Sequence, residues 1–129
     1  MDEPVLAGLL FADKIITENN GKKAIIGTFT RFFGSQFPAS FPPWAIYAAV
    51  TNVSGEHAFA LQLVDAESNQ MVVQLTGKFE AHQKSDVVEL TPTIMGAVFP
   101  KVGKYTLLFL VDGEPIGART LLVEVTKER

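Results

Sequence analysis

The chain has 129 residues and a mass of 14.1 kDa, a size at which one domain is expected. It contains no cysteine, which excludes disulfide frameworks, thiolate zinc sites and cysteine nucleophiles. Hydrophobic residues make up 47% and charged residues 19%, so we expect a folded core within a single domain, residues 1–129. The formal net charge of −3 argues against electrostatic binding to nucleic acid or to an anionic membrane.

The first residues do not resemble a secretory signal. The apolar run Val5–Ala12 follows Asp2, Glu3 and Pro4, whereas a signal peptide begins with basic residues. The run is also far shorter than the roughly 20 residues that span a bilayer. We therefore interpret it as the first strand of a cytoplasmic protein.

Apolar and polar residues alternate along much of the chain with a period of two. In Met71–His82 the odd positions are apolar or small, and the even positions from Gln74 onward are polar. The pattern recurs in His57–Asp65 and, over a shorter length, in Val87–Thr91. No segment keeps the spacing of an amphipathic helix over a full helical length. The alternation predicts an all-β protein whose strands have one buried and one solvent-facing side.

Two turn sequences predict two-residue hairpins. Asn20-Gly21 and Asp112-Gly113 each lie between two apolar runs. Asn, Asp and Gly tolerate the positive φ angles that a type I′ turn requires. Further turn signals recur at roughly 8–12 residues, which predicts about eight strands in an immunoglobulin-like antiparallel β-sandwich.

The residues that lead into the last strand but one carry a more specific signal. Gly103, Tyr105 and Leu107 alternate there in a pattern that resembles the tyrosine corner of immunoglobulin-like domains. In such a corner the tyrosine hydroxyl donates a hydrogen bond to upstream backbone, and Leu107 would take the place of a core cysteine. We predict structural roles for Gly103, Tyr105 and the turn residue Gly113. The alternative is that Tyr105 is an ordinary residue of an amphipathic strand.

The sequence supplies no motif for catalysis or metal binding. His57 and His82 are isolated and are expected to be solvated, and no serine elbow or phosphate-binding glycine pattern occurs. Asp65 opens a run with alternating oxygen donors, but Gln70 and Thr76 stand where a calcium loop needs Gly and Glu. We therefore predict no catalytic residue, no cofactor, no metal ligand and no enzymatic activity.

A charge-free segment runs from Phe32 to Gly55 and is rich in aromatic residues and proline. The rings either plug the open end of the sandwich, with Trp44 in the core, or form an exposed surface for a partner or ligand. The plug is the simpler interpretation, but aromatic residues with few charges are also typical of interface cores, so the second interpretation stays open. The residues of that candidate surface are Phe33, Phe37, Phe41, Trp44 and Tyr47.

Four stretches of the chain carry a family resemblance. They are Phe11-Ala12-Asp13, Ile25-Ile26-Gly27-Thr28-Phe29, Leu61-Gln62-Leu63-Val64-Asp65 and Val111-Asp112-Gly113-Glu114. With the Phe/Pro-rich loop that follows the second stretch, they resemble a family of small bacterial proteins known only as a domain of unknown function. The resemblance spans nearly the whole chain. It implies a free-standing immunoglobulin-like sandwich and carries over no catalytic residue.

These observations favour a non-catalytic protein-interaction or assembly module, with its aromatic surface around residues 32–47 and a protein partner of unknown identity. The alternative is a carbohydrate- or small-ligand-binding module that uses Trp44, Tyr47 and nearby rings. The segments Trp44–Val53 and Tyr105–Val111 are apolar on both faces. Because an antiparallel strand facing water normally alternates, they also predict a homodimer through a flat sheet face.

Overall fold

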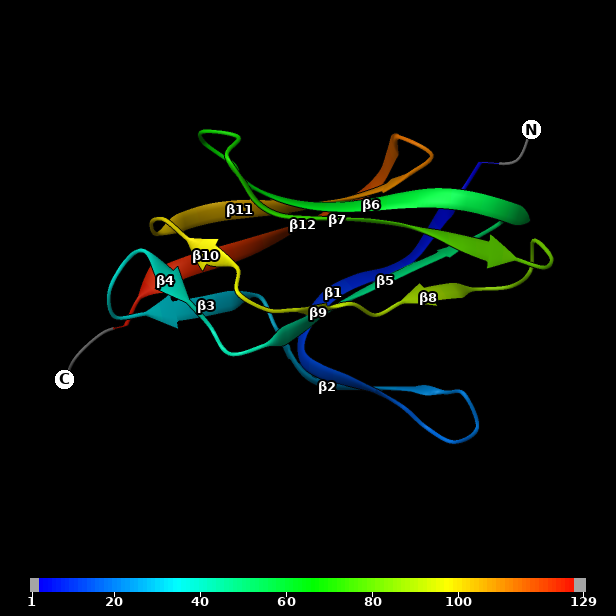
Figure 1. The fold of residues 1–129 in the computed structure, drawn as a ribbon, viewed down its shortest axis with the longest axis horizontal. Helices are drawn as coiled ribbons and strands as arrows, with labels where there is room; N and C mark the ends of the chain where they lie inside the picture. Colours follow the sequence, from blue (N-terminus) through cyan, green and yellow to red (C-terminus); the bar gives the residue numbers. More distant parts are fainter. Residues whose placement is uncertain (1–2, 127–129) are drawn as a thin grey trace.

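The structure, a computed structural model, describes residues 3–126 and contains twelve strands and no helix in that range. Two sheets pack face to face as a β-sandwich, which confirms the all-β prediction (Figure 1). No helix in residues 3–126 is long and apolar enough to cross a membrane.

Sheet A forms one layer of the sandwich. Its strands, in spatial order, are β2 (Lys23–Phe29), β1 (Val5–Thr17), β5 (Trp44–Thr51) and β8 (Val88–Leu90), with β9 (Thr93–Ile94) also paired to β5. All of these pairs are antiparallel. Leu9 and Phe11 on β1, and Ile46 on β5, point into the core and are buried.

Sheet B forms the other layer. Its strands, in spatial order, are β3 (Arg31–Gly34), β12 (Glu114–Val125), β11 (Gly103–Val111), β6 (Gly55–Asp65) and β7 (Met71–Ala81). Only β3 runs parallel to its neighbour, β12. A short pair, β4 (Ala39–Ser40) with β10 (Val98–Phe99), lies beside β3 at one end of the sandwich (Figure 1).

The alternation in the sequence correctly predicts which residues of these strands are buried and which face solvent. Leu61 and Leu63 on β6, and Val73 and Phe79 on β7, are buried, while the residues between them are half-buried or exposed. The predicted count of about eight strands is too low. The strands of two to four residues in the loops are too short to show a period of two. The immunoglobulin-like topology stays a prediction.

The Asp112-Gly113 turn is the predicted two-residue hairpin. Asp112 and Gly113 have φ angles of 50° and 83°, and Val111 pairs with Glu114 across the turn. Both central residues therefore take the left-handed conformation of a type I′ turn. The structural role predicted for Gly113 agrees with this geometry.

The turn prediction at Asn20-Gly21 is wrong in type. Glu18 N–H donates to Lys22 O at 2.8 Å, and Gly21 N–H donates to Glu18 O at 2.9 Å. Among the described turn residues only Gly21 has a positive φ, at 87°. This is a three-residue loop that ends in a left-handed glycine, so the hairpin closes one residue wider than predicted.

The environment of Tyr105 contains the hydrogen bond that the tyrosine corner predicts. The Tyr105 side chain is fully buried, and its hydroxyl donates to Lys101 O at 2.6 Å. The ring meets Phe99 edge-on, with ring centroids 5.0 Å apart. Gly103, at the start of β11, has a φ of 144°, a conformation that favours glycine. The hydrogen bond and the ring packing of Tyr105 thus hold the start of β11 against the loop that precedes it.

We expect Tyr105→Phe to lower the free energy of unfolding by about 1 kcal/mol, because the ring still packs while Lys101 O loses its donor. Urea unfolding followed by tryptophan fluorescence measures the change. Unchanged stability would mean that the hydroxyl contributes nothing and that only the ring anchors β11.

Candidate interaction surface

The aromatic residues of the charge-free segment close one end of the core, and the surface predicted from them does not exist as such. Trp44 is only 3% exposed. It packs edge-on against Phe11, Phe29 and Phe32, with ring centroids 5.5–6.2 Å apart. Phe41 stacks on Phe32 at 4.2 Å. The interpretation that these rings plug the sandwich, with Trp44 in the core, is therefore correct.

The other members of the predicted surface are scattered. Phe37 is half-buried and packs against the core, and Tyr47 lies half-buried on the solvent face of sheet A. Of the five predicted residues only Phe33 is well exposed, at 55%. Because the Trp44 ring is buried, it offers no face on which a sugar could stack, and the carbohydrate alternative loses its main residue.

Tyr47 is held in place by an acidic neighbour. Its hydroxyl donates to Glu89 Oε2 at 2.6 Å. Burial, together with this hydrogen bond and the nearby negative charge, raises the pKa of Tyr47 to about 12. The phenol therefore remains protonated at physiological pH and acts as a structural donor between β5 and β8.

His57 is not the solvated residue that the sequence predicts. Its side chain is 21% exposed, with Nδ1 2.6 Å from Asp112 Oδ2 and Nε2 2.8 Å from the carbonyl oxygen of Ser54. A carbonyl oxygen only accepts, so Nε2 must donate. The hydrogen bond to Asp112 raises the pKa of His57 and lowers that of Asp112. Ser54 contributes only backbone here, so the pair is a clasp between two turns and not part of a catalytic triad.

The loop that begins at Asp65, which lacks the residues of a calcium loop, lies next to the ammonium group of Lys101. Asp65 is buried, and its Oδ1 accepts the Glu67 N–H at 2.9 Å. Its Oδ2 lies 3.5 Å from Lys101 Nζ. The Glu67 backbone hydrogen bond is the main reason that the pKa of Asp65 is lowered. Within residues 3–126 no group of three or more His, Cys, Asp or Glu side chains is arranged to hold a metal ion.

The solvent face of sheet B has an uncharged centre. Inward residues of β11, such as Leu107 and Phe109, are fully buried, so the residues between them face outward. The strand register aligns these with the outward residues of the two adjacent strands. The nine residues of this centre, which we call the sheet B face, are Thr106, Leu108, Leu110, Ala60, Gln62, Val64, Ala118, Thr120 and Leu122. Lys104 on β11 pairs with Leu122 and also faces outward, so a charged side chain limits the uncharged centre at this end.

Charged pairs border the sheet B face on both sides. Arg31 on β3 and Glu124 on β12 form an ion pair at 2.8 Å, and Lys78 on β7 lies 3.8 Å from Glu56 on β6. An apolar or neutral centre with a polar rim is the usual anatomy of a protein interface. The rim carries both signs of charge at each border.

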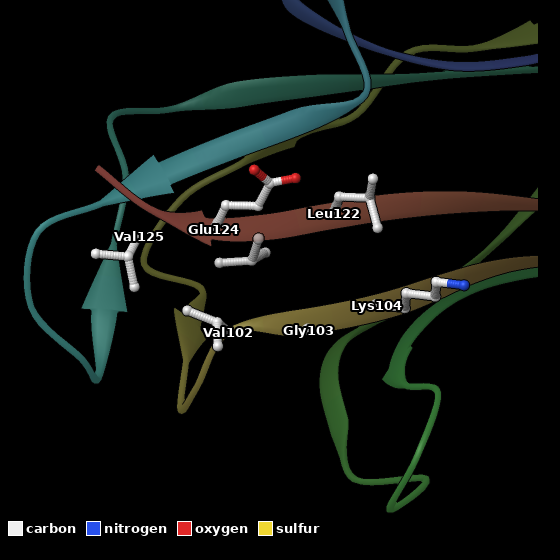
Figure 2. A pocket seen from close by; sticks show the side chains of 7 residues that line it. Val102, Gly103, Lys104, Leu122, Glu124 and Val125 are labelled. Atoms are coloured by element: carbon white, nitrogen blue, oxygen red, sulfur yellow. The ribbon is translucent and has the colours of Figure 1, made fainter. Parts of the chain in front are cut away.

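One end of the sheet B face is hollowed. A shallow depression of about 340 Å³ lies between the start of β11 and the end of β12 (Figure 2). Val102 and Val125 flank it and are 42% and 53% exposed. Leu122 belongs both to this hollow and to the sheet B face. The hollow is mainly apolar and can accept an apolar side chain, and Lys104 and Glu124 contribute the two charged groups of its lining.

A family model described as "Family of unknown function (DUF6941)" matches residues 8–124. The chain belongs to this family. The match runs from β1 to β12 and includes the sheet B face. It confirms the predicted resemblance to a family of unknown function, while bacterial origin stays a prediction. No curated protein matches the chain.

The sheet B face was partly visible in the sequence. The apolar residues at both parities of Tyr105–Val111 marked Leu108 and Leu110 as candidates. The contributions of β6 and β12 could not be predicted, because they depend on which strands lie beside β11. The segment that forms β5 is also apolar at both parities, and the sequence therefore predicted an uncovered apolar face there as well. In the structure Ala45 and Ala49 of this strand are buried within the chain itself. That part of the argument for an exposed apolar face is wrong.

Proposed function

We propose that this protein is a non-catalytic assembly module that binds a second copy of itself through the sheet B face. The observation that carries the proposal is the uncharged centre, which spans three adjacent strands inside a charged rim. Half-buried leucines such as Leu108 and Leu110 gain by leaving water, since burial of apolar surface contributes roughly 25 cal/mol per Å².

A second copy suits this surface because its rim is charged on both sides with both signs. A two-fold axis that passes through the centre of the sheet B face places a charged border of one copy next to a charged border of the second copy. Arg31 and Glu124 can then meet opposite charges of the partner subunit, and a two-fold contact of this kind is the commonest in soluble oligomers. The hollow beside Val102 offers room for an apolar side chain from that subunit.

Leu108→Glu tests the proposal. Two symmetry-related glutamates in the centre of the contact would be desolvated without a partner, so we expect the dissociation constant to rise about a hundredfold or more. Light scattering over a concentration series should show the particle mass halved. Circular dichroism should be unchanged, because Leu108 lies on the solvent face and the glutamate can reach water in the single chain.

Leu10→Glu is the matched control. Leu10 is also a half-buried leucine of an inner strand, but it faces solvent on sheet A, opposite the proposed contact. It should leave the particle mass unchanged. An unmodified protein that is monomeric at several hundred micromolar, or an equal effect of the two substitutions, would refute association through the sheet B face.

A further inference from the structure

Strand β7 is an outer strand of sheet B and is eleven residues long. Among the described residues it pairs along its length only with β6. It contains no proline, and the register shift of this pair lies near one end, between Leu63 and Val64. A long outer strand of this kind presents backbone groups to which another strand can bind.

The hydrogen bonds of β6 reveal which residues of β7 carry those groups. Ala58 N–H donates to Asp112 Oδ1 at 2.9 Å, and Asp112 N–H donates to Ala58 O at 2.8 Å, so the backbone of Ala58 faces away from β7. Because backbone groups alternate sides along a strand, those of His57 and Phe59 face β7. Their register partner residues on β7 have odd numbers, among them Gly77.

The even-numbered residues of β7 therefore direct both N–H and C=O to the free edge. These residues are Gln74, Thr76, Lys78 and Glu80. All four side chains are exposed on the solvent face, so no side chain of the core has to move for the edge to be used. We call these four residues the β7 edge.

We propose that the β7 edge pairs antiparallel with the β7 edge of a second copy, around a two-fold axis at Gly77. In this register Gln74 lies opposite Glu80 of the partner subunit, and Thr76 lies opposite Lys78 of the partner subunit. All four members of the edge are used, which makes about eight hydrogen bonds between the chains. The proposal does not depend on association through the sheet B face.

Side-chain charges and strand length favour this register over registers with the axis closer to Ala81. An axis at Thr76 opposes no like charges either, but it pairs Glu80 with Val72, which lies at the register shift of the β6–β7 pair. A shift of the axis to Lys78 places the two lysines directly opposite each other, which is unfavourable. A shift to Phe79 moves Gln74 past Ala81, where β7 ends. In the register around Gly77 the acceptor groups of Glu80 meet the amide donors of Gln74, and no like charges are directly opposed.

The core side of the same register is also complementary. Leu75 is half-buried, although it lies on the inner face of β7 near the open edge of the sandwich. Across the axis it would lie opposite Phe79 of the partner subunit, and Phe79 is a core residue. The added strand would therefore cover apolar surface at the edge as well as complete the backbone hydrogen bonds.

Thr76→Pro tests the edge selectively, because it removes an N–H that points away from β6. A proline is tolerated on an outer strand when the lost N–H faces solvent. By symmetry each dimer loses two hydrogen bonds, so the dissociation constant should rise about thirtyfold. Thr76→Val keeps the N–H and should leave the particle mass unchanged. Circular dichroism and urea unfolding establish that both variants are folded.

Disulfide trapping tests the register and remains informative if the proline variant unfolds. The chain has no cysteine, so single substitutions report only the designed contact. In the proposed register the Cα atoms of residue 76 and of residue 78 of the partner subunit are about 5.5 Å apart, within the range of a disulfide. A mixture of Thr76→Cys and Lys78→Cys chains should cross-link under mild oxidation, and Thr76→Cys alone should cross-link much less.

The two proposals fail in different ways. Leu108→Glu should leave the edge-paired dimer intact, and Thr76→Pro should leave a dimer formed through the sheet B face intact. Absence of the cross-link in the mixture, or a dissociation constant that Thr76→Pro leaves unchanged, refutes edge pairing whatever the effect of Leu108→Glu. An unmodified protein that is monomeric at several hundred micromolar refutes both.

Discussion

Phe32→Ala is expected to lower the free energy of unfolding by about 3 kcal/mol. Phe32 lies in the centre of the ring cluster at the end of the sandwich. Its ring stacks on Phe41 and meets Phe29, Trp44 and Phe99 at centroid distances of 4.6–5.9 Å. Removal of the ring leaves a cavity between β3 and sheet A that rigid neighbours cannot fill. Urea unfolding monitored by circular dichroism measures the change without relying on Trp44, whose surroundings are altered.

Phe33→Ala is the matched control, one residue along the same strand. Phe33 points to solvent, and its truncation should change stability by about 0.5 kcal/mol or less. Equal effects of the two substitutions would contradict the assignment of Phe32 to the core and Phe33 to the surface. A large effect of Phe33→Ala on particle mass would show that its ring belongs to a contact between chains.

Fold class could be predicted because several of the long strands carry their own evidence. The alternation in β6 and β7 and the Asp-Gly hairpin are local signals, and local signals suffice to identify antiparallel strands. Tyr105 could be predicted for the same reason, since its hydrogen bond spans only four residues. The type of the Asn20-Gly21 turn was missed because Asn is compatible with either sign of φ, and the pairing of Thr17 with Lys23 decides the loop length.

The position of the aromatic residues could not be predicted because it depends on contacts far along the chain. Phe32 meets Phe99, which lies on β10, and Trp44 meets Phe11 from β1. A charge-free aromatic segment has the same composition whether it covers a core or a partner. β3 alternates Phe32 inward and Phe33 outward, but four residues flanked by loop are too few to reveal a period of two.

The β7 edge could not be predicted from the sequence, because it depends on the order of the strands in the sheet. The alternation of Met71–His82 identifies which residues face water, and this prediction is confirmed. It does not determine whether a strand lies inside a sheet or at its border. That follows only from the strand order, in which β6 has two neighbours and β7 has one.

The clasp between His57 and Asp112 should make stability depend on pH near neutrality. The folded pKa of His57 is raised above its ordinary value of 6.5, so the clasp is complete below that pH and is lost as the pH rises through the folded pKa. The pKa of Asp112 is lowered, so its contribution persists until acid protonates the carboxylate. When His57 is neutral and Nε2 still donates to Ser54 O, the lone pair of Nδ1 faces Asp112 Oδ2, and the attraction disappears.

Asp112→Ala should therefore lower the free energy of unfolding by about 2 kcal/mol near pH 5.5, where the clasp is complete. Two losses combine, because alanine is strained at the φ of 50° and the Ala58 N–H loses its acceptor. Asp112→Asn tolerates the turn and keeps an acceptor, so it should cost less. It should also reduce the fall in stability as the pH rises through the folded pKa of His57, because only the hydrogen bond to the Ser54 carbonyl then holds that pKa up. His82→Gln is the control, since His82 is 86% exposed and should not alter that fall. A pH dependence that is undiminished in Asp112→Asn would contradict the clasp. The difference between the alanine and asparagine variants measures the strain of the turn and the loss of the Ala58 acceptor separately from the charge.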